Sequence, residues 1–284
     1  MTSSLLAGLG LALASASALN WGFFTQHGAA SALPPLSLRR PVRSLCLLFG
    51  DRVWLAGFVV GLAGWALYVA ALALAPLSLV QAASAGGIGL LALLVSRETA
   101  LTAWERRGVV VSIAGLVLLA ASLSGHSHGS HGSAWAVAVW VAVSLGAALA
   151  AALSRTAAGL GLAAGILYAA GDVATKAAVP GGSRLAFVPL LLVCHGLAFA
   201  ALQLGFQRGG ALATAGVATL FTNALPIAAG TTLFGEGLGP RPTVRILAFA
   251  CTVAGATLLT RTERQARRPA TDFPGARDRY HLTD

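Results

Sequence analysis

Gly159-Leu-Gly-Leu-Ala-Ala-Gly-Ile-Leu-Tyr-Ala-Ala-Gly-Asp-Val-Ala-Thr-Lys176 is the sixth long apolar segment of the chain. Within it, Asp172 and Lys176 are four residues apart and would therefore share one face of a helix. A charged group at membrane depth costs about 2.5 kcal/mol or more, and it usually has a partner and a function. The spacing predicts an ion pair at a transport site. The alternative is that Lys176 snorkels to the membrane surface and Asp172 only neutralises it.

The composition of the whole chain indicates a polytopic membrane protein. Hydrophobic residues make up 57% of the 284 residues, charged residues only 10%, and the mean hydropathy is +0.79. Soluble domains are about 25% charged. The formal net charge of +10 comes from arginines that lie between apolar segments. This charge therefore reports on membrane topology and does not indicate a nucleic-acid partner.

Apolar segments of the right length predict an all-α fold with about nine transmembrane helices. No basic residue precedes the first apolar run, so we expect an uncleaved first helix and no signal peptide. The short apolar run Ser44–Gly50 predicts an interfacial helix. The predicted spans cover residues 4–26, 53–74, 77–95, 108–123, 134–153, 157–178, 185–206, 210–233 and 244–260.

The distribution of arginine predicts the orientation in the membrane. With the N-terminus outside, fifteen arginines fall in cytoplasmic regions and three, Arg184, Arg241 and Arg245, fall outside. This asymmetry follows the positive-inside rule and predicts an integral protein of the plasma membrane with a cytoplasmic C-terminus. Residues 261–284 form an Arg-rich segment with two prolines, which predicts a disordered cytoplasmic tail.

Two groups of four predicted spans carry the same landmarks. A glutamate follows the third span of each group (Glu98 and Glu236), and an Ala-Gly pair lies in the fourth (Ala114-Gly115 and Ala254-Gly255). One extra span separates the groups, so the second group would run opposite to the first, as in many secondary transporters. Residues 1–260 would then form one transporter domain, with a first quartet at 4–123, a linker helix at 134–153 and a second quartet at 157–260.

The run Leu74-Ala-Pro-Leu-Ser-Leu-Val-Gln81, the glutamate after the span it begins, and the glycine in the closing span resemble the drug/metabolite transporter superfamily (EamA-like). The lysine that ends the sixth span, and Gln203 followed by Gln207 in the seventh, make the chain most similar to the NIPA-like branch, whose members are described as magnesium transporters. The resemblance implies a layout of four, one and four helices and secondary transport of a metabolite or of Mg²⁺. A proline expected after Val80 is absent, and a His-rich loop is added.

The polar side chains inside the predicted spans are the candidate binding groups. Neutral amides and hydroxyls suit hydrogen bonding to a small organic solute, although they also join helices to one another. A lone carboxylate beside an ammonium group is a poor site for Mg²⁺, which prefers several hard oxygens. The predicted binding residues are Asp172, Lys176, Gln203, Asn223, Asn20 and Gln81, with Gln26, Ser84, His195 and Thr219 as further polar groups of the spans.

Three other groups have two interpretations each. Glu98 and Glu236 lie at span ends, where they would be entrance carboxylates or structural helix-end groups. His126, His128 and His131 lie in a Gly/Ser-rich loop predicted to be outside, as a weak metal or pH-sensing site or as a plain connector. Gly57-x-x-x-Gly61 and Gly161-x-x-x-Gly165 predict close helix packing, within one chain or in a homodimer.

The sequence does not favour an enzyme. An intramembrane aspartyl protease needs two carboxylates that share a proton, and the predicted spans hold only Asp172. Gly235-Glu-Gly-Leu-Gly239 lacks the Gly-Lys-Ser/Thr of a nucleotide-binding loop, so we expect no cofactor. Three hypotheses remain: a secondary transporter of a small organic solute or ion, a NIPA-like transporter of Mg²⁺ or another divalent cation, and a non-transporting scaffold. In each case membrane lipids are partners, and arginines of the tail would bind anionic lipids in the last.

Overall fold

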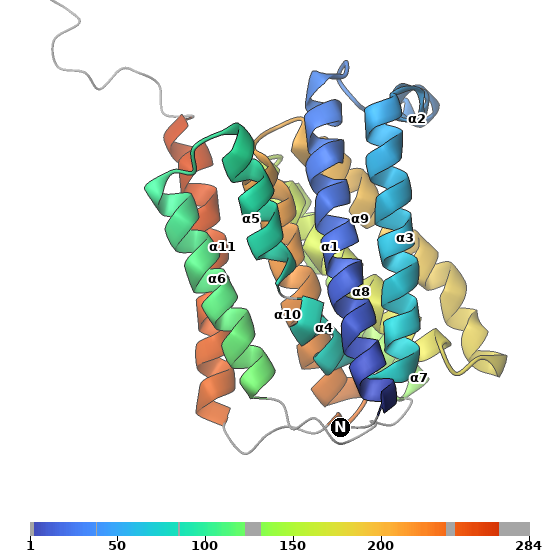
Figure 1. Cartoon of the computed structure of the whole chain (residues 1–284). Helices are drawn as coiled ribbons and strands as arrows, with labels where there is room; N and C mark the ends of the chain where they lie inside the picture. The colour runs from blue at the N-terminus through green and yellow to red at the C-terminus, as the bar shows by residue number, and fades with distance from the viewer. Residues whose placement is uncertain (1–2, 38, 85, 123–131, 237–241, 267–284) are drawn as a thin grey trace, which may run out of the picture.

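Every regular element of the computed structural model is a helix, among the residues that it describes, 3–37, 39–84, 86–122, 132–236 and 242–266 (Figure 1). Within these described residues, six helical segments are long and apolar enough to cross a membrane. The prediction of an all-α protein with membrane-spanning helices is confirmed at this level. The six segments are α1 (Ser3–Ala32), α3 (Arg52–Leu74), α7 (Ala134–Ala152), α8 (Ala157–Ala178), η1 with α9 (Gly182–Phe187 and Val188–Phe206), and η2 with α10 (Leu212–Gly216 and Val217–Leu233).

The predicted third span is not one continuous helix. It is divided into α4 (Leu77–Ser84) and α5 (Gly87–Glu98). Glycine is a poor helix former, and two consecutive glycines, Gly86 and Gly87, stand where α5 begins. A Cβ atom on Gly87 would collide with the side-chain amide of Asn20. The glycines at the break therefore let α1 approach the start of α5 closely at Asn20, a predicted binding residue.

The remaining helices are α2 (Pro41–Gly50), α6 (Ala103–Ala121) and α11 (Pro242–Ala266). Helix α2 is the predicted short helix, and it ends beside Asp51, whose carboxylate accepts a hydrogen bond from the backbone N–H of Trp54 at 2.7 Å. This bond caps the N-terminus of α3, as expected for an aspartate at that position. Helix α10 continues through Pro226 without a break, and the irregular part of this segment is the π-helical turn η2.

Small residues set how closely the helices pack. A Cβ atom on Gly22 of α1 would lie 2.7 Å from the carbonyl oxygen of Gly57 on α3. Gly165 of α8 stands equally close to Ala218 of α10, and Gly161 touches Thr214 of η2. These contacts confirm the prediction that Gly57 and the Gly161/Gly165 pair permit close packing, and they occupy those glycine faces within one chain.

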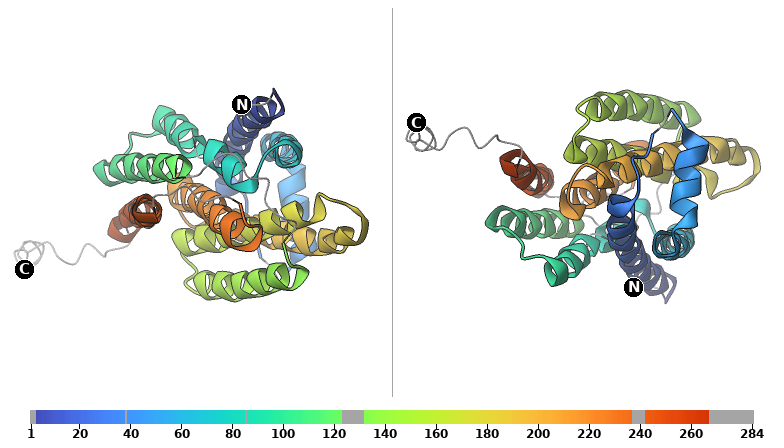
Figure 2. Two further views of the ribbon diagram at one scale, coloured as in Figure 1. Left: turned by 90° about the horizontal axis from the view of Figure 1, so that it is seen from below. Right: turned by 90° about the horizontal axis from the view of Figure 1, so that it is seen from above.

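The end-on views show a bundle with α7 and α11 at its periphery (Figure 2). Helix α1 packs on α3, α8 packs on α9 and α10, and α6 packs on α11. Most side chains of α8 and α10 are buried. Helix α1 begins and α11 ends at opposite ends of the bundle (Figure 1).

Hydrogen bonds between loops show at which end of the bundle three of the arginines lie. At the end where α1 finishes, the backbone N–H of Leu36 donates to Gln207 Oε1 at 2.8 Å, and the neighbouring Arg208 donates to the carbonyl of Arg155 at 2.8 Å. At the end where α1 begins, Arg184 donates to the carbonyl of Gly132 at 2.9 Å. Arg155 and Arg208, both predicted to be cytoplasmic, thus lie together, and Arg184, predicted to be outside, has its contacts at the opposite end.

Candidate functional site: a polar cavity between α1, α3, α8, α9 and α10

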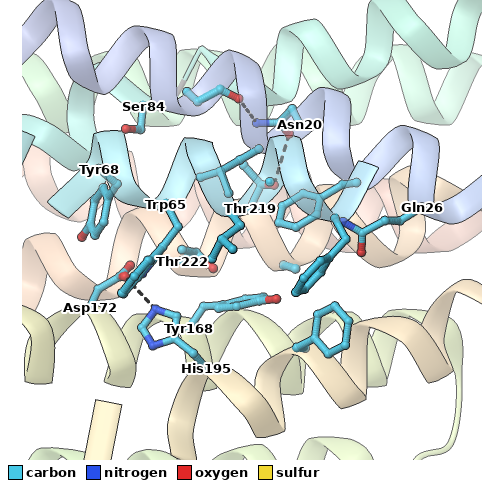
Figure 3. A pocket seen from close by; sticks show the side chains of 18 of the residues that line it. Asn20, Gln26, Trp65, Tyr68, Ser84, Tyr168, Asp172, His195, Thr219 and Thr222 are labelled. Atoms are coloured by element: carbon cyan, nitrogen blue, oxygen red, sulfur yellow. Dashed lines mark hydrogen bonds and ion pairs between the residues drawn. The ribbon is translucent and has the colours of Figure 1, made fainter. Parts of the chain in front are cut away.

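A cavity of about 420 Å³ lies in the middle of the bundle (Figure 3). Helices α1, α3 and α4 line one side, and α8, α9 and α10 line the other. Leu45 and Phe49 of α2 also contribute to the lining. The lining is mainly aliphatic and aromatic, with a few polar groups that converge, which is the usual character of a small-molecule site.

Asp172 is the centre of the polar groups. Its Oδ1 atom lies 3.5 Å from Nε2 of His195 on α9. Its Oδ2 atom accepts a hydrogen bond from Gln81 Nε2 at 3.0 Å, and the same amide nitrogen donates to the hydroxyl of Tyr68 at 2.7 Å. Asp172 therefore joins side chains from α3, α4, α8 and α9, which come from both predicted quartets.

Lys176 is not the partner of Asp172, so the predicted ion pair is wrong. Lys176 Nζ points instead to the carbonyl oxygen of Leu72 at 3.5 Å, near the end of α3. Although the two side chains leave the same helix four residues apart, Asp172 turns to donors on α4 and α9 that surround the cavity. Lys176 is not among the residues that line the cavity.

The structure brings together most of the other predicted binding residues. Asn20, Gln81 and Asn223 line the cavity with Asp172. Glu98 is exposed at the end of α5, whereas Glu236 is buried and accepts a hydrogen bond from the backbone N–H of Leu77 at 2.9 Å. His126, His128 and His131 lie outside the described residues. Within the described part of the chain, no group of three His, Cys, Asp or Glu residues is arranged to hold a metal ion.

Gln203 lies behind the cavity wall rather than on it. Its amide nitrogen donates to Gln26 Oε1 at 2.6 Å, and its Oε1 accepts from the indole N–H of Trp54 at 3.0 Å. All three residues are buried, and they join α9 to α1 and α3. This arrangement favours the structural interpretation of Gln203, as a polar link between helices.

Gln203→Leu should lower the melting temperature of the protein in detergent. The substitution leaves the indole N–H of Trp54 and the amide oxygen of Gln26 buried without their partner, and each stranded group costs about 1–3 kcal/mol. In the double variant Trp54→Phe/Gln203→Leu, the stranded indole N–H is gone, so the two effects should be less than additive. Strict additivity, or an unchanged melting temperature for Gln203→Leu, would show that the link does not stabilise the fold.

Comparison with family models, curated proteins and solved structures finds no match for this chain. The function of the chain is therefore inferred from the geometry of the cavity.

The feature that distinguishes this cavity from a packing defect is its set of buried polar atoms. Trp65 and Asn223 line the cavity, and the indole N–H of Trp65 and Oδ1 of Asn223 are buried without a hydrogen-bond partner. Unpartnered buried groups are rare in native proteins and need an explanation.

Aromatic side chains frame one side of the cavity, and the sequence did not single them out. Phe58 of α3 and Phe199 of α9 meet with ring centroids 5.7 Å apart. Trp65 of α3 meets His195 of α9 at 5.7 Å, and Tyr168 of α8 meets the same histidine at 5.7 Å. An aromatic residue in an apolar helix gives no periodic signal that separates a cavity face from a lipid face.

Between these aromatic pairs the cavity reaches the lateral surface of the bundle. Leu62 of α3 and Leu192 of α9 line the cavity and are nevertheless 53% and 58% exposed. Gly61 and Gly196 stand beside them on the two helices. A Cβ atom on Gly196 would meet no atom within 4 Å, so the α9 side of the cavity is open at this level.

Proposed function

We propose that this protein is a secondary transporter that moves a small organic solute through the cavity between two inverted quartets of helices. The observation that carries the proposal is the lining of the cavity. Three helices of the first quartet and three of the second supply its walls, and Asp172, Gln81 and His195 connect the two groups. A binding site between two repeats is the arrangement that allows one repeat to move against the other.

The packing of the helices supports the inverted quartets. The first two spans of each quartet pack together, as α1 with α3 and as α8 with α9. The third span packs on the first in both, as α4 and α5 on α1 and as α10 on α8, and the fourth spans, α6 and α11, pack on each other. The third span is irregular in both quartets, through the break between α4 and α5 and through the π-turn η2. This matched pattern also supports membership of the drug/metabolite transporter superfamily.

For the membrane topology we propose nine crossings with the N-terminus outside and the C-terminus in the cytoplasm of the cell. Helix α1 starts at one end of the bundle and α11 ends at the other, which agrees with an odd number of crossings (Figure 1). The separation of Arg155 and Arg208 from Arg184 agrees with the positive-inside rule. A reporter enzyme fused after Arg264 should report the cytoplasm, and an external signal from that fusion would overturn this orientation.

The chemistry of the lining favours an organic solute over Mg²⁺. Gln81 aims its amide N–H at Asp172, and the imidazole of His195 faces the other carboxylate oxygen. Mg²⁺ binds through hard oxygens and retains water, so nitrogen donors around one carboxylate are a poor match. A solute with one acceptor for the indole N–H of Trp65 and one donor for Oδ1 of Asn223 would remove both unpartnered groups.

Uptake by purified protein in liposomes tests the proposal. The probes are a panel of radiolabelled amino acids, amines, sugars, nucleosides and carboxylates, with ²⁸Mg²⁺ as the divalent-cation arm. We expect at least one organic solute to enter faster than in protein-free liposomes and to show saturation. Uptake of Mg²⁺ alone would support the divalent-cation hypothesis, and no uptake of any probe would support the scaffold.

A further inference from the structure

His195 has one ring nitrogen whose protonation the geometry determines. Its Nδ1 atom lies 2.9 Å from the carbonyl oxygen of Leu191, one helical turn earlier. A carbonyl oxygen only accepts hydrogen bonds, so Nδ1 carries the hydrogen. A neutral imidazole holds a single N–H hydrogen, and in that form Nε2 would present a lone pair. Nε2 is the atom that faces Asp172 Oδ1 at 3.5 Å.

A lone pair facing a carboxylate is repulsive, so a proton belongs between the two groups. Two arrangements place it there: an imidazolium opposite a carboxylate, or a neutral imidazole that accepts from a carboxylic acid. Both hold the same single proton, and the pair is then neutral overall. Release of this proton to water leaves the Asp172 carboxylate and a neutral His195, with a net charge of −1 in a buried site.

We propose that Asp172 and His195 share one exchangeable proton, and that this proton is the coupling ion of the carrier. The second half of this statement rests on the proposed transport function. Binding of solute donors at Asp172 stabilises the charge that proton release leaves behind. Solute binding and proton binding at this carboxylate are therefore linked, and linkage of this kind is what couples two ligands in one carrier.

The other groups that face the pair do not compete for the proton as charges. Gln81 of α4 is a neutral amide that donates to Asp172, and the neutral hydroxyl of Tyr68 of α3 accepts from Gln81 and is itself hydrogen-bonded to Asp172. Trp65 of α3 and Tyr168 of α8 pack their rings against His195. Lys176, one turn along α8, points to Leu72. Among the described residues that line the cavity, no Lys, Arg or Glu stands with the pair.

The position of the pair suits exchange of a proton with the cavity. The side chain of Asp172 is only 6% exposed, whereas that of His195 is 17% exposed. Both residues line the cavity, so a water molecule in the cavity has a direct route to them. The imidazole is thus the more accessible partner for exchange.

Infrared difference titration of the reconstituted full chain from pH 4 to pH 10 tests the site without any solute. In the wild-type minus Asp172→Asn/His195→Gln difference, the carboxyl bands of Asp172 and the imidazole bands of His195 should change together in the same transition. Because two strongly interacting groups titrate as a pair, Asp172→Asn alone should move the transition of the His195 bands to a different pH. The matched control is His27→Gln, which removes a half-buried histidine of α1 bonded to the carbonyl of Gly209 at 3.2 Å. This control should leave the transition in place.

Asp172 bands and His195 bands that change in different transitions, or His195 bands that are the same with and without Asp172→Asn, would overturn the shared proton. The coupling role is tested on wild-type liposomes with a solute from the uptake panel. A one-unit pH gradient should change its steady-state accumulation by about tenfold for one proton per solute. Steady-state accumulation of the solute that is the same with and without the pH gradient would overturn the coupling role. An intact titration without uptake of any solute would instead overturn the proposed transport function and leave the proton site standing.

Discussion

Asp172→Ala should reduce the initial rate of solute uptake by more than about 100-fold. The substitution leaves His195 without its partner and removes the acceptor that Gln81 has at 3.0 Å. Breaking a buried charged pair by removal of one member typically destabilises the arrangement that contains it by about 3–5 kcal/mol, and each 1.4 kcal/mol lowers the population of the binding-competent arrangement by about a factor of ten. The rate is measured in proteoliposomes with equal amounts of incorporated protein, and Asp172→Asn provides a variant of similar shape that retains a polar side chain.

Lys176→Ala is the matched control, because Lys176 lies on the same helix but points to Leu72 at 3.5 Å. We expect this variant to keep most of the uptake. The double variant Asp172→Ala/Lys176→Ala should be as inactive as Asp172→Ala alone. Recovery of folding or uptake in the double variant would mean that the two residues are partners after all. Near-normal uptake by Asp172→Ala would refute the placement of the site.

Gly196→Trp should block uptake while the protein remains folded. Gly196 lines the cavity on α9, and no atom lies within 4 Å of the position that its Cβ atom would take. The Cβ atom of the new side chain therefore has open space beside a cavity of only about 420 Å³, into which we expect the indole to project. We expect a loss of uptake of at least about tenfold, since even one side chain in the path excludes a solute held by close contacts. Melting temperature and elution volume should stay as in the wild type.

Gly146→Trp provides the control for Gly196→Trp. Gly146 lies in α7, also has no atom within 4 Å of its Cβ position, and is not part of the cavity lining. The two substitutions add the same indole to an exposed glycine of a membrane-spanning helix. Equal loss of uptake in both variants would indicate a general effect on folding or insertion. Normal uptake in Gly196→Trp would place the solute path elsewhere.

The sequence was sufficient to predict the helical fold class and part of the candidate site. Composition and segment length predicted an all-helical membrane protein. A membrane span must form its backbone hydrogen bonds within itself and present apolar side chains to the lipid. Polar residues in those segments, such as Asn20, Gln81 and Asn223, were found because they are unusual there. The break before α5 is explained by Gly86-Gly87. It was not predicted, because the residues on both sides of it are apolar and look like one continuous span.

The partners of Asp172 could not be predicted from spacing. Residues four apart on a helix share a face, yet a side chain turns toward the best donors, which here come from α4 and α9. His195 lies twenty-three positions after Asp172 in the sequence, so no helical period connects them. The bond between Gln203 and Trp54 likewise joins residues 149 positions apart. Only the packing of the helices brings these groups together.

Solute counterflow tests the central claim most directly. Liposomes that contain the wild-type protein are loaded with an unlabelled solute from the uptake panel and diluted into a trace of the labelled solute. A carrier whose single site alternates between the two sides should give a transient internal accumulation of label above equilibrium, and Gly196→Trp should abolish it. Label that only approaches equilibrium, at a rate independent of the internal solute, would contradict an alternating site between the quartets.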